Sequence, residues 1–200
     1  MTSTRHGRAR SSARPPRQPR LGKADSVEQH NMVKGVDYIG VGAGAMVFDS
    51  SGSVFLAKRG SGARNEPKHW EFPGGAVQLH ERLRDAIKRE FIEEYGMVIE
   101  PKHLLCVTDH ILPVENQHWV SVCFIASHIS GNPRVLEPEK CLAIRWCHLN
   151  DLPAPLTLIS SSYLREYRAA YGDNVNPCLD GGRELLYPVR PRARGELQRR

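Results

Sequence analysis

The chain has 200 residues, of which 40 % are hydrophobic and 25 % are charged. These proportions are ordinary for a globular chain, and the length suits one domain with a sizeable core plus terminal tails. No run of about 18 apolar residues occurs, so the sequence predicts no membrane span, and the N-terminus lacks the apolar segment of a secretory signal. We therefore expect an intracellular protein. The cytoplasm is the simplest location, and organelle import stays open because the N-terminus is rich in Arg and Ser.

The net charge of +6 is unevenly distributed along the chain. Residues 1–23 hold six Arg and one Lys without an acid, and residues 183–200 hold six Arg and two Glu. The remainder has 15 basic and 20 acidic residues, so an acidic body carries two basic ends. We predict a disordered basic tail over residues 1–35, a folded domain over 36–172 and a second basic tail over 173–200. The first tail is a plain solvated segment, an arm for nucleic acid or an acidic partner, or a transit peptide.

The expected elements follow one another in chain order. Residues 38–48 and 54–59 predict a β-hairpin, and a short strand from Trp70 stops at Pro73 and two glycines. Strands at 103–112, 118–129 and 141–149 lie between two helices, which are predicted at 80–95 and 158–172 and each end at a glycine. Strands with two unlike helices and no regular βαβ alternation predict an α/β (α+β) sandwich with a mixed β-sheet. The five cysteines include no C-x-x-C pair, which argues against a zinc site or a disulfide framework.

The first predicted helix places carboxylates beside its apolar stripe. At about 100° per residue, Glu94 lies about 20° from Ile87, Glu90 about 60° away and Glu93 about 120° away, all on one side. Burying unpaired carboxylates is costly, so a cation should compensate them. Arg89, four residues before Glu93, is one candidate, but a single Arg cannot neutralise three glutamates. Hard oxygen ligands at this spacing suit Mg²⁺, with Mn²⁺ as a substitute.

The same segment carries a 23-residue signature. Gly75 is followed after five residues by Glu81 and, after seven more, by the run REFIEEYGM from Arg89 to Met97. Every fixed position resembles the Nudix box, and Trp70 with Phe72-Pro73-Gly74 precedes it as in that family. The resemblance implies an α/β/α sandwich whose loop, helix and loop hold divalent metals on a pyrophosphate.

Matched residue by residue, the resemblance assigns a role to each position. Glu90, Glu93, Glu94 and the Gly74 carbonyl would be metal ligands, Arg89 would orient the glutamates, and Gly75, Glu81 and Gly96 would support the box. Catalysis would involve Glu90, Arg89, Glu94 and Glu139. Glu90 is the first choice as the base that accepts the proton of water, and Glu139 is the loop alternative.

Outside the box, the sequence has HWVSV at 118–122, EPEKC at 137–141, Trp146 and LPAPL at 152–156. These segments resemble a narrower group, the MutT-like nucleoside-triphosphate and dihydroneopterin-triphosphate diphosphatases. This resemblance favours a nucleotide-like triphosphate that is cleaved to monophosphate and pyrophosphate. Gln78 and His80 depart from the group's pattern without removing a main metal ligand. The pair Thr157-Leu158 replaces a Phe-Trp pair that resembles a stacking platform, so we expect weak selectivity among bases. Trp70, Phe72, His118 and Leu158 are the candidate substrate-binding residues.

A rival hypothesis comes from the tails. A Nudix-fold module could bind RNA through its Arg-rich ends as part of a ribonucleoprotein, with weak or no catalysis. Loss of box carboxylates would favour that view, and all of them are present. The oligomeric state stays open, with a homodimer among the alternatives.

Overall fold

The computed structural model describes residues 32–172, so the predictions for most of both tails lie outside the described residues. Residues 32–35, which composition placed in the first tail, enter a turn in which the Gly35 amide donates to the Tyr38 carbonyl. Neither helix in the described part is long and apolar enough to cross a membrane. The described elements are β1 (Gly40–Phe48), β2 (Val54–Arg59), β3 (Trp70–Glu71), β4 (Gly74–Ala76), α1 (Leu83–Tyr95), β5 (Val98–Leu112), β6 (Gln117–Ser130), β7 (Cys141–Cys147) and α2 (Leu158–Tyr171).

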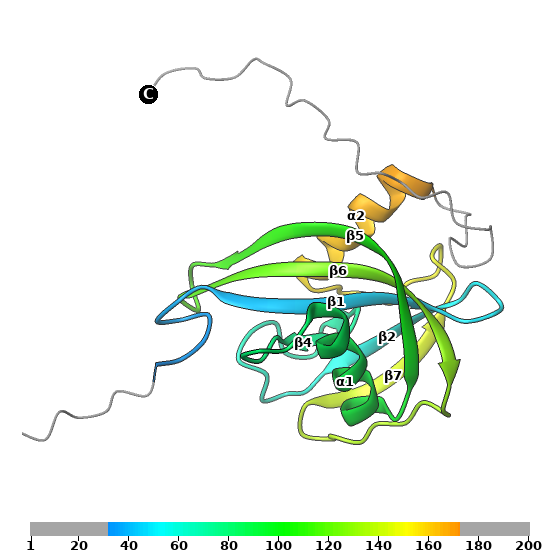
Figure 1. Cartoon of the computed structure of the whole chain (residues 1–200), viewed down its shortest axis with the longest axis horizontal. Helices are drawn as coiled ribbons and strands as arrows, with labels where there is room; N and C mark the ends of the chain where they lie inside the picture. Colours follow the sequence, from blue (N-terminus) through cyan, green and yellow to red (C-terminus); the bar gives the residue numbers. More distant parts are fainter. Residues whose placement is uncertain (1–31, 173–200) are drawn as a thin grey trace, which may run out of the picture. The chain divides into compact units, whose positions relative to one another are not determined.

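The strands form one mixed sheet in the order β3-β2-β1-β6-β5, with β4 paired to β1 and β7 paired to β2. The β1 and β6 strands run parallel, whereas the other pairs are antiparallel. Figure 1 shows β5, β6 and β1 side by side, with β2 and β7 continuing the sheet. The predicted mixed sheet is confirmed.

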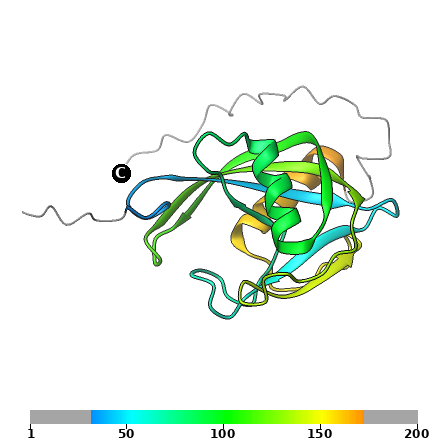
Figure 2. The same cartoon turned by 60° about the horizontal axis from the view of Figure 1, so that its bottom comes forward.

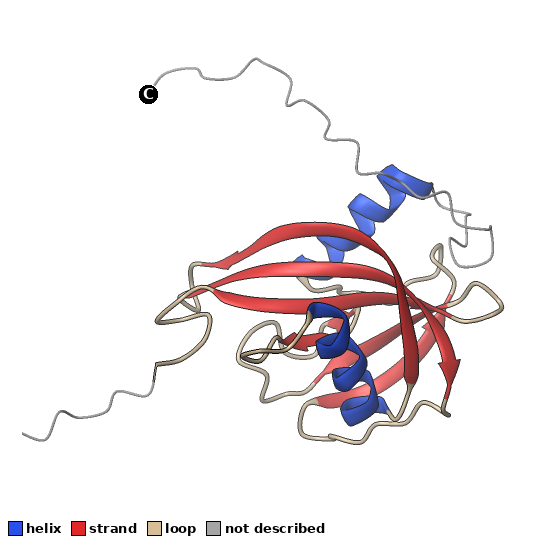
Figure 3. Cartoon of the chain, viewed as in Figure 1, coloured by secondary structure: helices blue, strands red, loops and turns tan. Residues whose placement is uncertain are grey.

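The two helices cover opposite faces of this sheet, as two views show (Figures 1 and 2). Along β1, Ala43, Ala45 and Val47 pack in a core cluster with α1 residues such as Phe91. Met46 and Phe48, which alternate with these residues along β1, belong to a second cluster that contains Tyr163, Leu164 and Tyr167 of α2. Successive side chains of a strand point to opposite faces, so one apolar strand supplies both cores. The strands lie between the helices (Figure 3), which confirms the predicted sandwich.

The expected hairpin between β1 and β2 is limited to its turn. Only Phe48 and Val54 are paired, and the Asp49 carboxylate accepts from the amides of Ser51 and Ser53 to hold the turn. Earlier in β1, residues Gly42 to Gly44 pair with β4 and not with β2. This pairing sets the start of the box against the centre of the sheet.

Helix α1 begins at Leu83, three residues after its predicted start. His80 has φ of 67°, outside the helical region, and the Glu81 carboxylate accepts from the Gln78 amide. The loop therefore uses these residues for its own hydrogen bonds. The end is as predicted: Gly96 is left-handed at φ 65°, and its amide donates to the Ile92 carbonyl.

Candidate active site

Arg89 is the centre of the box. Its Nε and Nη2 donate to both oxygens of Glu81 at 2.7 and 3.0 Å, and Nη1 donates to Glu90 at 2.8 Å and Glu93 at 3.0 Å. Nη2 also donates to the Ala76 carbonyl at 3.3 Å, which ties the loop to the helix. These bonds hold the pKa of Glu81 at about 2 and raise that of Arg89 above its usual range. One guanidinium thus fixes three carboxylates and the loop.

Gly75 allows Glu90 to approach the loop. A Cβ atom at this position would overlap the Glu90 carboxylate. At the neighbouring Gly74 a Cβ would instead overlap the Ala43 carbonyl oxygen in β1. The two glycines therefore serve different purposes: Gly75 makes room for a functional side chain, and Gly74 makes room for strand pairing.

The three helix glutamates differ in exposure. The side chains of Glu90 and Glu94 are 13 % and 14 % exposed, whereas that of Glu93 is 54 % exposed. Burial, helped by the negative charges of Glu90 and Glu71, raises the pKa of Glu94 to about 7. The nearest cation shown for it is Lys140, whose Nζ lies 4.0 Å from Glu94 Oε1. The helical geometry therefore placed two of the three carboxylates in partly buried positions, and Glu93 faces solvent.

In the described part of the chain, no three His, Cys, Asp or Glu side chains are arranged to hold a metal ion. Glu90 and Glu93 each give an oxygen to Arg89, so they are engaged in ion pairs. The donor set nevertheless fits a divalent cation. Glu94 is buried beside the negative charges of Glu90 and Glu71, and its contact with Lys140 at 4.0 Å offsets its own charge only in part. Carboxylate oxygens are the ligands that Mg²⁺ and Mn²⁺ prefer.

A small cavity of about 210 Å³ contains the Glu94 side of the box. Glu94 and Tyr95 line it together with Glu71, Gly74 and the loop residue Glu139. Lys140 also lines the cavity and forms an ion pair with Glu137 at 2.8 Å. The sequence-predicted Glu139 is therefore brought to the same cavity as Glu94.

A larger cavity of about 410 Å³ adjoins it and shares Arg59, Glu71 and Gly74 with it. Its volume is in the range of small-molecule sites. Trp119, Phe72 and Tyr163 supply aromatic rings to the wall, and the polar residues of the wall are Arg59, Arg64, Asn65, Glu66, Glu71, His110, Gln117, Ser121 and Thr157.

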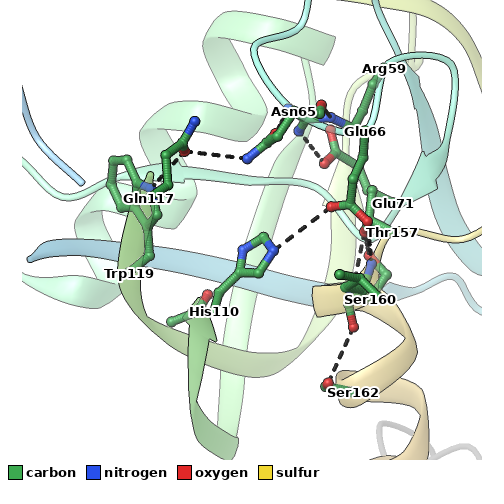
Figure 4. Close-up of polar contacts among 12 residues, drawn as sticks. Arg59, Asn65, Glu66, Glu71, His110, Gln117, Trp119, Thr157, Ser160 and Ser162 are labelled. Atoms are coloured by element: carbon green, nitrogen blue, oxygen red, sulfur yellow. Dashed lines mark hydrogen bonds and ion pairs between the residues drawn. The ribbon is translucent and has the colours of Figure 1, made fainter. Parts of the chain in front are cut away.

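A chain of hydrogen bonds crosses this cavity wall (Figure 4). Arg59 donates to Glu71 at 2.7 Å and to the Asn65 side-chain oxygen at 2.6 Å. Asn65 Nδ2 then donates to Gln117 Oε1 at 3.3 Å, which also accepts from Trp119 Nε1 at 3.1 Å. The chain links a carboxylate of the small cavity to the aromatic wall of the large one.

The sequence-predicted substrate-binding residues separate in the structure. Phe72 is buried and lines the large cavity, whereas Trp70, His118 and Leu158 are absent from its wall. The Trp70 ring packs against the core on the α2 side and lies 5.8 Å from Lys58 Nζ. Leu158 is 60 % exposed, and its amide donates to Glu66. His118 lies 3.9 Å from Asp109, and the adjacent residue Trp119 lines the cavity instead.

Sequence reasoning did not single out several cavity residues: Arg59, Asn65, Glu66, Glu71, His110, Gln117 and Trp119. They come from β2, the following loop, β3, β5 and β6, so no local spacing marks them. Alternation along residues 117–121 was a usable signal, because Gln117, Trp119 and Ser121 share one face of β6. That face lines the cavity.

Comparisons with known proteins agree with this geometry. Residues 39–167 match the family model of the NUDIX domain. The chain is 34 % identical over 87 residues to an 8-oxo-dGTP diphosphatase of Buchnera aphidicola, covering 44 % of this chain and 68 % of that protein. It is 27 % identical over 133 residues to the 8-oxo-dGDP phosphatase NUDT18 of Danio rerio, covering 65 % of this chain but only 38 % of that protein.

A solved structure is also similar to this chain. The MutT NUDIX hydrolase of Burkholderia pseudomallei is 40 % identical, with a TM-score of 0.60, and the match covers 64 % of this chain and 98 % of that one. The fold, the complete box and these matches establish that this chain belongs to the Nudix hydrolase family.

Proposed function

We propose that this chain hydrolyses a phosphoanhydride bond in a nucleoside or pterin triphosphate, releasing the monophosphate and pyrophosphate with the help of Mg²⁺. The observation that carries the proposal is the pair of adjoining cavities. One contains the carboxylates Glu94, Glu71 and Glu139, and the other presents aromatic rings and amides. A nucleotide-like substrate would match both cavities: its phosphate chain, with the metal ion, would bind at the carboxylates, and its flat polar ring would bind at the aromatic rings and amides.

The glutamates of the box would hold the divalent cation. Glu90, Glu93, Glu94 and the Gly74 carbonyl are the proposed ligands. When bound, the cation neutralises phosphate oxygens and lowers the pKa of an attacking water. Arg89 fixes the carboxylates beforehand, so that little reorganisation is needed on substrate binding.

Hydrolysis also needs a base. Water attacks the α- or β-phosphorus, the bond from that phosphorus to the α–β bridging oxygen breaks, and the monophosphate and pyrophosphate separate, while a carboxylate accepts the proton of water. We assign the role of the base that accepts this proton to Glu90. Glu139 is the alternative base, because it lines the small cavity together with Glu94. Comparing the pH profile of kcat for Glu90→Gln and Glu139→Gln distinguishes the two: loss of the acidic limb identifies the base.

A substrate screen tests the function itself. Nucleoside triphosphates, 8-oxo-dGTP, pterin triphosphate, ADP-ribose, dinucleotides and capped RNA would be compared with Mg²⁺, with phosphate and pyrophosphate measured separately. The proposal expects triphosphates to be the best substrates and pyrophosphate to be the product. Exclusive cleavage of ADP-ribose or dinucleotides, or release of orthophosphate alone, would contradict it.

The alternative function is an RNA-binding module that uses the basic ends. Twelve Arg in residues 1–23 and 183–200 motivate it, since such segments gain affinity by releasing counterions from phosphates. The intact box favours the enzyme. Tight, strongly salt-dependent RNA binding without turnover of any triphosphate in the screen would favour the module.

A further inference from the structure

Two residues that line the large cavity each carry a buried nitrogen atom without a hydrogen-bond partner in the described part of the chain. Gln117 Nε2 and His110 Nε2 are both buried, and neither has a partner within the described residues. Gln117 is only 5 % exposed, and both residues line the cavity. Buried polar groups in folded proteins are almost always paired, so a buried donor without a partner on a cavity-lining residue is a candidate contact for a ligand.

The orientation of the Gln117 amide follows from its neighbours. Arg59 can only donate, so the Asn65 atom that it contacts must be the oxygen, and Asn65 therefore presents its NH₂ group to Gln117. Trp119 Nε1 is a second donor-only group at the same Gln117 atom. If the Gln117 amide were turned the other way, its NH₂ group would face two donors, Asn65 Nδ2 and Trp119 Nε1. The Gln117 oxygen is thus fully used, and its NH₂ group is the part left to bind.

The second nitrogen has the same polarity. His110 Nε2 lies 3.7 Å from Glu66 Oε2, and burial lowers the pKa of His110, which favours a neutral ring. A carboxylate beside Nε2 favours the tautomer that carries its proton there. The His110 proton then points to Glu66, so Gln117 Nε2 remains as a donor for a ligand group that accepts.

We infer that Gln117 determines base specificity, because its NH₂ group donates to a carbonyl oxygen of the substrate's ring, as in hypoxanthine, guanine or uracil. The amine of adenine or cytosine presents a donor at the equivalent position and would leave Gln117 Nε2 unpaired. This inference rests on the proposed function, since it names the ring that accompanies the triphosphate. It refines the expected weak selectivity to a preference for oxo over amino bases.

The decisive variant is Gln117→Glu. It keeps an oxygen for Asn65 and Trp119 and replaces the NH₂ donor by an acceptor of the same shape. The substrates are two matched pairs, dITP with dATP and dUTP with dCTP, assayed at about pH 8.5 so that the new carboxyl is ionised. For at least one pair, the ratio of kcat/KM between the oxo and the amino member should fall about tenfold or more in the variant.

A matched control is Asn116→Asp. It adds the same charge one residue away, in an exposed turn at a residue that does not line the cavity. This control should leave both ratios unchanged, and thermal melting of both variants checks that they are folded. If Gln117→Glu changes the two members of each pair by the same factor, Gln117 has a structural role only and the inference is wrong.

A binding measurement separates this inference from the proposed function. The affinities of dIMP and dAMP, measured by calorimetry with wild type and Gln117→Glu, do not depend on turnover. A selective loss of dIMP binding supports the role of Gln117 even if no triphosphate is hydrolysed. An equal change for both monophosphates overturns that role even if triphosphates are hydrolysed well.

Discussion

The two sides of the candidate site are built in different ways. The box side, residues 75–97, is one stretch of chain in which Arg89 satisfies three carboxylates and a loop carbonyl. The pocket side, which comprises Asn65, Glu66, His110, Gln117 and Trp119, comes from a loop and two strands, and two of its buried nitrogens have no hydrogen-bond partner among the described residues. On the proposed function, bond cleavage would depend on a local structure that Arg89 holds in place. The choice of substrate would depend on residues that are distant from one another in the chain.

The largest expected effect comes from a substitution on the box side of the site. Glu94→Gln should lower kcat by about a thousandfold or more, because it removes a proposed metal ligand, and chelation should abolish turnover. The measurement is pyrophosphate release at saturating substrate and Mg²⁺. Glu166→Gln, on α2, is the control and should retain full activity. Near-wild-type turnover by folded Glu94→Gln would remove Glu94 from the set of ligands.

The adjacent glycines offer the next test. In Gly75→Ala the new Cβ overlaps the end of the Glu90 side chain, so kcat should fall about tenfold to a hundredfold with a small change in melting temperature. In Gly74→Ala the overlap is with the backbone of Ala43, so stability itself should fall by about 1 to 3 kcal/mol. Urea titration and steady-state kinetics on both variants check this. Equal loss of stability in the two would contradict the distinct roles of the glycines.

Two glutamates of the box should respond to pH with opposite signs. The pKa of Glu81 is held at about 2, below its unfolded value, so its contribution to stability is present above about pH 4.5 and is lost as the pH falls toward 2. The pKa of Glu94 is raised to about 7, so the metal-free protein loses stability as the pH rises from about 4.5 to 7.

Metal-free melting curves from about pH 3 to 8 test these signs, because this range covers most of the interval between the ordinary glutamate pKa and each shifted pKa. Glu81→Gln should be less stable than wild type at neutral pH and approach it in acid. Glu94→Gln should match wild type in acid and be more stable at neutral pH, by about 1 to 3 kcal/mol. The same sign for both variants would refute the contrast.

The smallest expected effect concerns the N-terminal tail. Deleting residues 1–23 should leave kcat/KM on a mononucleotide unchanged, because the box and the described residues that line both cavities lie within residues 42–163. RNA binding, measured by fluorescence anisotropy at two salt concentrations, should weaken and lose part of its salt dependence. A large fall in mononucleotide turnover would show that the tail belongs to the active site.

The sequence by itself determined the box, the mixed sheet between two helices and the end of α1 at Gly96. These features depend on interactions between near neighbours: the 3.6-residue spacing of a helix, the ridge that brings Arg89 to Glu93, and the alternation of buried residues in strands. The same local rules did not locate the start of α1, because Glu81 and Gln78 bond within the loop. Nor did they show that Glu93 faces solvent.

Only the tertiary structure decided the pocket side. The replacement of an aromatic pair by Thr157-Leu158 indicated a missing wall, yet Trp119 supplies an aromatic ring from β6. Its partner Gln117 meets Asn65, which is 52 positions earlier in the chain, because strand pairing and the loop after β2 bring the two side chains together. Contacts over such separations are set by sheet register, which no local spacing encodes.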